Sequence, residues 1–216
     1  MRGGRLVVVA PHPDDETLGC GSLIARAVNR SIGVAVIALT DGDASHPGSQ
    51  RWPPAALGAL RAAEMRRALA RLGAGDAPIR RLGWRDGRVT TDGDAGRLAR
   101  VLVELRAGVV LVTSDADHHP DHQAAARLAR AATRRLGLAL VRYAVWSRVG
   151  GPKHRPDQYR AAKHWAMAAH RSQVAPYIAD DPGGFRLSPT ALVSLTGGAE
   201  TFVSDGPWWS RGGSNP

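Results

Sequence analysis

The sequence Leu6-Val-Val-Val-Ala10 runs directly into Pro11-His-Pro-Asp-Asp-Glu16, which places one imidazole and three carboxyls after a short apolar segment. A continuous apolar run of this length is typical of a parallel strand that is buried on both faces. Ligands of open α/β sheets bind at the carboxyl ends of such strands. His12 and Asp15 can therefore share a divalent cation, with Asp14 free beside it. In the alternative interpretation, the acidic residues only cap the next helix.

A second group of metal-ligand side chains, His118-His-Pro-Asp-His122, follows the apolar run from Val109 to Val112. In a doubly wound sheet of order 3-2-1-4-5, the first and fourth strands are neighbours, so the two groups meet at the switch point of the sheet. Two histidines and one carboxylate leave the fourth position of a zinc ion open for water or substrate, as in catalytic sites. The spacing therefore predicts a catalytic metal centre.

Strand-like and helix-like segments alternate along the rest of the chain. This alternation predicts an α/β protein with a single Rossmann-like, doubly wound, mostly parallel sheet and helices on both of its faces. We expect one domain over residues 1–216, with a loop-rich region from about residue 175, where Pro182-Gly-Gly184 and Gly197-Gly198 interrupt the pattern. Strands are expected at 6–10, 33–40, 79–84, 109–113 and 138–146, and helices at 18–30, 55–72, 95–106, 123–136 and about 156–170.

The composition limits the classes of function. The 216 residues carry a formal net charge of +10, and 44% of them are hydrophobic, which is enough for one sizeable core. The basic residues are scattered arginines, and no basic stretch is interleaved with aromatic residues, so we expect no nucleic-acid partner. The composition leaves homo-oligomerisation open.

Cysteine content and hydropathy favour a cytoplasmic protein. Cys20 is the only cysteine, so no internal disulfide can form. The apolar run near the N-terminus is too short for the core of a signal peptide. No segment approaches the roughly 20 apolar residues of a membrane span, and we expect no stable membrane insertion.

With both clusters in view, the chain resembles the LmbE-like, or PIG-L, family of metal-dependent N-acetylglucosaminyl deacetylases over most of its length. The strongest motifs are Pro11-His-Pro-Asp-Asp-Glu16 with the following Thr17-Leu-Gly-Cys-Gly21, and His119-Pro-Asp-His122. Weaker motifs agree in order along the chain: Arg61-Ala-Ala-Glu64, Asp86-Gly87, His170-Arg-Ser-Gln173 and Glu200-Thr-Phe202.

The resemblance implies that His12, Asp15 and His122 are the zinc ligands and that Asp14 is the general base. These roles suit amide hydrolysis, because zinc lowers the pKa of a bound water to about 7 and polarises the amide carbonyl. A carboxylate beside the metal can then remove the proton of that water.

The same resemblance makes His119 the cationic partner of the transition state, oriented by Asp121. A tetrahedral oxyanion needs positive charge nearby, which a protonated imidazole supplies. The neighbouring His118 leaves a register ambiguity, because a shift of one residue would exchange the two histidines.

Three further features are open to two interpretations. Arg61 and Asp86 resemble sugar-contacting positions of the family, but by themselves they indicate a helix-surface ion pair with Glu64 and ordinary turn chemistry. The loop at 41–54 is either a lid or wall of the substrate site or an ordinary solvated loop. The pair Trp208-Trp209 either stacks on a sugar or packs on its own domain or a partner.

We therefore expect a zinc-dependent N-deacetylase that acts on a small molecule, an N-acetylglucosamine-type glycoside or glycoconjugate. Another divalent metal such as Fe²⁺ can take the place of zinc, because the ligand types alone do not fix the metal. The alternatives are an amidase of a related thiol-glycoside conjugate and a non-catalytic α/β module that binds a metal or a nucleotide. The missing glycine-rich phosphate loop after the first strand argues against the nucleotide module.

Overall fold

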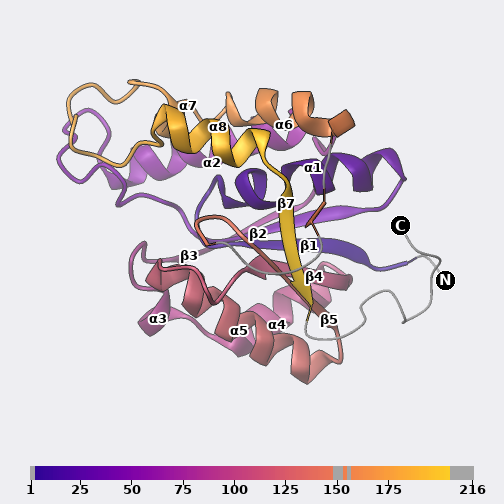
Figure 1. The fold of residues 1–216 in the computed structure, drawn as a ribbon. Coiled ribbons are helices and arrows are strands. Elements are labelled where there is room, and N and C mark those ends of the chain that lie inside the picture. The colour runs from indigo at the N-terminus through magenta and orange to yellow at the C-terminus, as the bar shows by residue number, and fades with distance from the viewer. Residues whose placement is uncertain (1–2, 148–152, 155–156, 205–216) are drawn as a thin grey trace.

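The computed structural model describes residues 3–147, 153–154 and 157–204, and its centre is a sheet of order β3-β2-β1-β4-β5-β7-β6 (Figure 1). Strands β1 to β5 are parallel, so the predicted order 3-2-1-4-5 is confirmed. Strand β7 runs antiparallel to both β5 and β6. The strands are β1 (Arg5–Ala10), β2 (Val34–Thr40), β3 (Ile79–Trp84), β4 (Ala107–Thr113), β5 (Ala139–Tyr143), β6 (Lys153–His154) and β7 (Glu200–Ser204).

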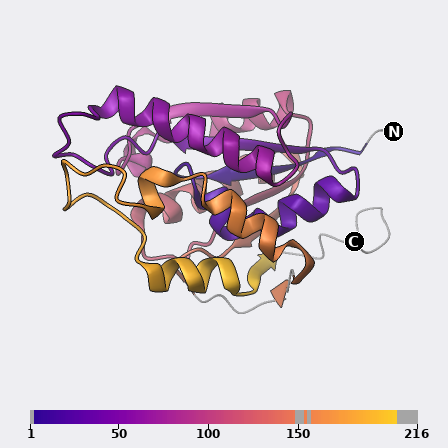
Figure 2. The same ribbon diagram turned by 90° about the horizontal axis from the view of Figure 1, so that it is seen from above.

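Helices pack on both faces of the sheet, as the alternation of elements predicts (Figure 1). Helices α1, α2, α6 and α8 cover one face, and Figure 2 shows α2, α6 and α8 side by side over it. Helices α4 and α5 cover the other face. The helices are α1 (Asp15–Asn29), α2 (Pro54–Arg71), α3 (Val89–Asp92), α4 (Ala95–Glu104), α5 (Pro120–Leu136), α6 (Arg160–Met167), α7 (Arg171–Val174) and α8 (Pro189–Gly197).

Strand β1 contributes to the cores on both faces of the sheet. Val7, Val8 and Val9 are 0% exposed. Val8 packs in the core on the α1 and α2 side, whereas Val7 and Val9 pack in the core on the α4 and α5 side. Burial on both faces explains why this strand is an unbroken apolar run rather than an alternating one.

Helix α1 begins earlier than the sequence pattern predicts, at Asp15 rather than at residue 18. The carbonyl of Asp14 accepts hydrogen bonds from the N–H groups of Thr17 and Leu18 at 3.0 and 2.8 Å, so the first helical turn already contains the acidic motif. The predicted strand at 138–146 is shorter in the structure, because β5 ends at Tyr143.

The C-terminal third also differs from expectation. Of the helix predicted at about 156–170, the structure forms a 3₁₀ turn at Asp157–Tyr159 and α6 at Arg160–Met167, and Pro156 lies outside the described residues. The sequence predicts loops from about residue 175, whereas the structure also places α8 and β7 there. Trp208 and Trp209 lie outside the described residues. Among the described helices, none combines the length and the apolar character needed to cross a bilayer.

Candidate metal and catalytic site

The two histidine and carboxylate clusters meet at the carboxyl ends of the central strands β1 and β4. Strands β1 and β4 are parallel neighbours with Val9 opposite Val112, so the segments that follow them lie side by side. His12 lies in the turn after β1, Asp15 opens α1, and His122 lies in the first turn of α5. Donor atoms of these three side chains lie within 4.8 Å of one another. This is the switch point at which open α/β sheets bind ligands.

Asp15 links the two histidines. Its Oδ2 lies 3.2 Å from Nδ1 of His12 and 3.3 Å from Nε2 of His122. Neighbouring ligand atoms of a four-coordinate zinc, at about 2.0–2.1 Å from the ion, are about 3.3 Å apart. The same oxygen accepts the backbone N–H of His12 at 2.9 Å, which fixes the turn between these two residues. The donor types and their spacing therefore fit one divalent cation.

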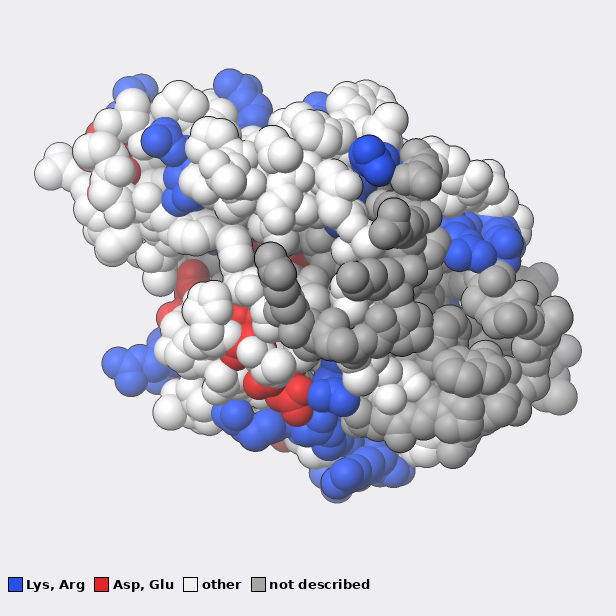
Figure 3. Space-filling model, in the orientation of Figure 1, with Lys and Arg blue, Asp and Glu red and all other residues white. Residues whose placement is uncertain are grey.

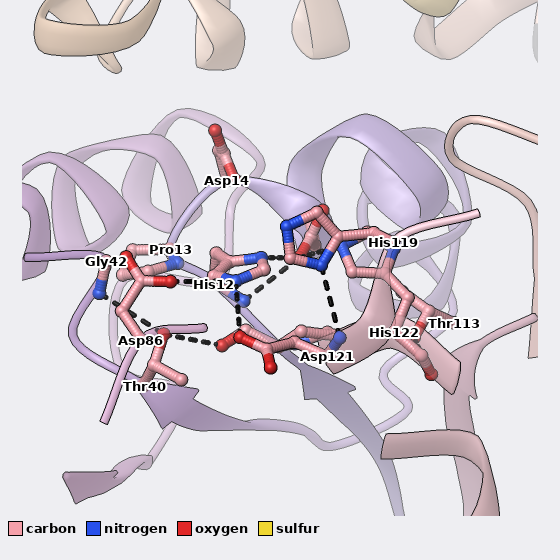
Figure 4. A network of polar contacts seen from close by, with 12 residues as sticks. His12, Pro13, Asp14, Thr40, Gly42, Asp86, Thr113, His119, Asp121 and His122 are labelled. Carbon is pink, nitrogen blue, oxygen red and sulfur yellow. Dashed lines mark hydrogen bonds and ion pairs between the residues drawn. The ribbon is translucent and has the colours of Figure 1, made fainter. Parts of the chain in front are cut away.

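Each of the two histidines has a carboxylate at its other ring nitrogen. Nε2 of His12 lies 3.2 Å from both Asp86 Oδ1 and Asp121 Oδ2 (Figure 4). Nδ1 of His122 lies 3.2 Å from Asp117 Oδ2. Carboxylates in this position orient a metal-ligating imidazole and make it a stronger ligand.

The surrounding carboxylates make the site favourable for positive charge. Burial alone would lower the pKa of His12, but hydrogen bonds to three aspartates, the first of them Asp121, raise it well above its ordinary value. Burial likewise acts to lower the pKa of His122, but Asp15 and Asp117 raise it to about 9. Burial would raise the pKa of Asp15, but the two histidines lower it. A divalent cation can replace the two imidazolium protons in this field.

Asp14 is buried beside the ligands in an unusual backbone conformation. Its φ is 147° and its ψ is −26°, and a positive φ is disfavoured for a residue with a Cβ atom. Its Oδ2 lies 3.4 Å from Nη2 of Arg61, and in Figure 4 its side chain lies on the side of His12 opposite to Asp86 and Asp121. Burial raises the pKa of Asp14 to about 6, although Arg61 opposes the shift. A carboxyl with this pKa can accept and release a proton near neutral pH.

Only one of the two adjacent histidines lies against the cluster. The side chain of His118 is 79% exposed. The ring of His119 lies 4.8 Å from that of His12 and 4.9 Å from that of His122, measured between ring centres. The structure therefore brings His119, and not His118, to the candidate ligands.

The expected orientation of His119 by the Asp121 carboxylate is corrected by the structure. That carboxylate accepts two backbone N–H groups and faces His12, whereas the backbone N–H of Asp121 donates to Nδ1 of His119 at 3.2 Å. Because Nδ1 is an acceptor, Nε2 carries the proton. Burial and the charges of His12 and His122 lower the pKa of His119. In this geometry His119 is a neutral hydrogen-bond donor rather than an imidazolium.

Arg61 and Asp86 both lie next to the site, where Arg61 contacts backbone carbonyls and Asp86 contacts His12. Arg61 is 3% exposed and donates to the carbonyls of Gly42 and Pro13 at 2.8 and 2.9 Å, so it does not form a helix-surface ion pair. Asp86 contacts His12 and accepts the backbone N–H of Ala44 at 3.1 Å. Contacts of Arg61 and Asp86 with a sugar stay a prediction.

The loop at 41–54 reaches the cluster through the backbone N–H of Ala44, which donates to Asp86. The backbone N–H of Phe185 donates to the carbonyl of Ser45 at 2.7 Å, and Asp180 accepts two backbone N–H groups of the same loop. These contacts fix the loop against the segment that follows α7, and its role as a lid or wall of the substrate site stays a prediction. Figure 3 shows acidic side chains gathered in the recess between the two layers of helices, with Lys and Arg dispersed over the outer surface.

From the sequence, Asp117 is one of several residues that could enter the site, and the structure places it there. It is 0% exposed and holds Nδ1 of His122 from five positions earlier in the chain. The only signal in the sequence is a carboxylate in the loop before the helix. Asp115 in the same loop offers the same signal but pairs with Arg130 and Arg142 instead.

The fold and the site define a class: a Rossmann-like α/β protein with a candidate divalent-metal centre of two histidines and one aspartate at the switch point of its sheet. The sequence profile of the PIG-L family, described as GlcNAc-PI de-N-acetylase, matches residues 7–133. The chain therefore belongs to the PIG-L family.

Individual relatives agree with this assignment. A 1D-myo-inositol 2-acetamido-2-deoxy-alpha-D-glucopyranoside deacetylase of Tsukamurella paurometabola is 34% identical in an alignment of 164 positions that covers 59% of this chain and 54% of that protein. The chain spans about half the length of this relative and of two mycobacterial proteins of the same name.

Solved structures share the fold over nearly the whole chain. A conserved protein of Thermus thermophilus has a TM-score of 0.74 and 29% identity, with 96% of this chain and 99% of that chain covered. The N,N'-diacetylchitobiose deacetylase of Pyrococcus horikoshii has a TM-score of 0.76, with 95% of this chain and 84% of that chain covered. At 19% identity, this second likeness shows a common fold.

Proposed function

We propose that the protein is a zinc-dependent N-deacetylase, a hydrolase that removes the acetyl group from an N-acetylated amino sugar. The observation that carries this proposal is the position of Asp14, a buried carboxyl with a pKa of about 6, directly before the candidate ligand Asp15. A metal site with an open position and a carboxylate base beside it suits metal-assisted amide hydrolysis. The deacetylase names of the curated relatives support an acetamide as the target.

Two histidines and one carboxylate suit zinc, and Fe²⁺ is the alternative. His12, Asp15 and His122 would hold the cation, which when bound supplies Lewis-acid activation of water and of the amide carbonyl. Asp14 then accepts the proton of the attacking water, because a pKa of about 6 leaves its carboxylate largely ionised near neutral pH. The protonated Asp14 then returns this proton to the leaving nitrogen as the C–N bond of the tetrahedral intermediate breaks, so that acetate and a free amino sugar leave.

His119 has a role distinct from that of Asp14. Its Nδ1 accepts the backbone N–H of Asp121, so the proton on Nε2 is available to the substrate. A hydrogen bond from Nε2 to the carbonyl oxygen strengthens as this oxygen becomes negative, which stabilises the transition state more than the ground state.

The proposed substrate is a small N-acetylglucosamine-type glycoside or glycoconjugate in the cytoplasm. The relatives named above act, by their names, on an inositol glycoside and on diacetylchitobiose. The arginines are scattered along the sequence, which favours no nucleic-acid partner. The carboxylates that follow β1 would repel a pyrophosphate, so a nucleotide-binding role is not favoured.

The test is release of acetate from a panel of N-acetylglucosamine, N,N'-diacetylchitobiose and 1D-myo-inositol 2-acetamido-2-deoxy-α-D-glucopyranoside. Protein stripped by a chelator and reloaded with Zn²⁺ or Fe²⁺ is expected to release acetate and free amine in equal amounts, whereas stripped protein and a His12→Ala variant are expected to be inactive. Folded, metal-loaded protein that releases no acetate from any member of the panel would contradict the proposal. Cleavage only of amides of thiol-glycoside conjugates would instead favour the amidase.

A further inference from the structure

Glu16 is the one carboxyl of the Pro11–Glu16 motif that has no part in the proposed reaction. Its side chain is 0% exposed, and buried carboxylates require partners. Glu16 Oε2 accepts the backbone N–H of Asp14 at 3.1 Å, and Glu16 Oε1 accepts the hydroxyl of Thr17 at 2.6 Å. The carboxylate therefore contacts the main chain of the candidate base directly.

A histidine from a distant segment completes this network. His170 lies between α6 and α7 and is 0% exposed, and its Nε2 lies 3.3 Å from Thr17 Oγ1 and 3.6 Å from Glu16 Oε1. Because the hydroxyl hydrogen of Thr17 is directed to Glu16, Thr17 Oγ1 is free to accept the Nε2–H of His170. The hydrogen bonds thus run in one direction, from His170 through Thr17 to Glu16, whose other oxygen accepts the N–H of Asp14.

The residue at the end of this chain of hydrogen bonds is strained. A non-glycine residue at a φ of 147° costs free energy and persists only where its surroundings over-determine it. Neighbouring groups are fixed as well: Arg61 donates to the carbonyl of Pro13, and the carbonyl of Asp14 caps α1. Glu16 is the group that fixes the remaining polar atom of the Asp14 main chain, its N–H.

We propose that Glu16, Thr17 and His170 are positioning residues that hold Asp14 in its strained conformation and thereby direct its carboxylate at the reacting water. This inference rests on the proposed function. The competing interpretation is a network that only anchors α1 to the segment between α6 and α7, in which case its loss lowers stability without acting through Asp14.

A double-mutant cycle on kcat separates these interpretations. Glu16→Gln keeps the shape but weakens the acceptor, and we expect kcat to fall about 10- to 100-fold, with KM and zinc content unchanged, because a misdirected catalytic group costs rate in this range. In an Asp14→Asn background the same change should cost less than about twofold, since it acts only through the carboxylate that is already missing. A full, multiplicative loss in that background would overturn the proposal.

Two further comparisons guard against misfolding and general destabilisation. Thr17→Ser keeps the hydroxyl and should retain kcat, whereas the isosteric Thr17→Val should have a lower kcat. If Glu16→Gln does not fold, this pair of variants decides between a positioning role and simple anchoring of α1. Glu200→Gln is the matched control, because Glu200 is also a buried carboxylate that accepts backbone N–H groups of α1, those of Ser22 and Leu23. This variant should unfold at lower temperature but keep kcat.

The strain itself has an independent readout. A Gly→Ala change at an ordinary position raises the stability of the fold, but at a residue with a positive φ the same change lowers it. Asp14→Gly should therefore unfold at a higher urea concentration than Asp14→Ala. The reverse order, or wild-type kcat in both Glu16→Gln and Thr17→Val, would overturn the positioning role alone. Absence of acetate release by the wild-type protein would instead overturn the proposed function, and the positioning role with it.

Discussion

At the scale of single residues, two adjacent aspartates have opposite electrostatic environments. The pKa of Asp15 is lowered by the two histidines despite its burial, so this carboxyl stays ionised as a ligand must. Burial raises the pKa of Asp14 to about 6. Separation of the pKa values of neighbouring groups suits them to different roles, which supports the proposed assignment of Asp15 as ligand and Asp14 as base.

Asp14→Asn should therefore keep the cation and lose hydrolysis. The amide fills the same space but accepts no proton, and removal of a general base costs about 10²- to 10⁴-fold in kcat. The measurement is acetate release at saturating substrate, together with zinc content by elemental analysis. Turnover near the wild-type rate in zinc-loaded protein would point to a different base.

The two adjacent histidines provide a matched pair of variants. His119→Ala should lower kcat about 10²- to 10³-fold, the cost of one oxyanion donor, with zinc content and KM nearly unchanged. His118→Ala, at a side chain that is 79% exposed, should have the wild-type kcat. The assignment would have to be exchanged if His118→Ala were the slow variant.

At the scale of elements, close packing of α1 against β5 holds the ligand-bearing turn in place. A Cβ atom on Gly19 would lie 2.2 Å from Cδ2 of Tyr143, whose hydroxyl donates to the carbonyl of Val9. Gly19→Ala should lower the free energy of unfolding by about 1–3 kcal/mol, the usual cost of overpacking. Gly197→Ala, where a Cβ atom meets nothing within 4 Å, is the control and should be neutral or slightly stabilising in urea denaturation.

Asp115 connects α5 to β5 through Arg130 and Arg142. Burial would raise the pKa of Asp115, but hydrogen bonds from the two arginines lower it. The two ion pairs of Asp115 therefore stabilise the fold fully above the unfolded-state pKa of about 4. This contribution is lost as the pH falls through the lower pKa of the folded state. Asp115→Asn should therefore be less stable than the wild type at about pH 7, with a difference that shrinks below about pH 4. A difference in urea midpoint that is constant over this range would contradict the expectation.

Patterns that are local in the sequence predicted the fold and the meeting of the two histidine and carboxylate clusters. The apolar run of β1, the acidic turn after it and the order of strands were all predictable, because burial on both faces and the switch point leave few alternatives. The partner of the Asp121 carboxylate could not be predicted from the sequence, because the direction of this side chain depends on how α5 packs against β1. Strand β7 was missed for a related reason: its pairing with β5 joins segments that are far apart in the chain.

At the scale of the whole molecule, a cation at the switch point would couple metal binding to folding. Zinc added to the stripped protein should raise its melting temperature, and at 100 times Kd the stabilisation is about 2.7 kcal/mol. Asp117→Asn, which removes the carboxylate beside His122, should weaken zinc binding about 10- to 100-fold, whereas Asp115→Asn should not. Calorimetric scans over a zinc series measure both effects, and a melting temperature that does not respond to zinc would contradict the coupling.

The pairing of β1 with β4 also sets an order of events during synthesis. His12 and Asp15 are translated before His122, and they would offer a cation only two ligands until His122 has been translated and β4 has docked beside β1. Two ligands hold a divalent ion weakly, and thiols or free histidine of the cell would compete for it. The nascent chain would therefore acquire its metal only after the centre of the sheet has assembled, so that occupancy of the site would report the pairing of β1 with β4.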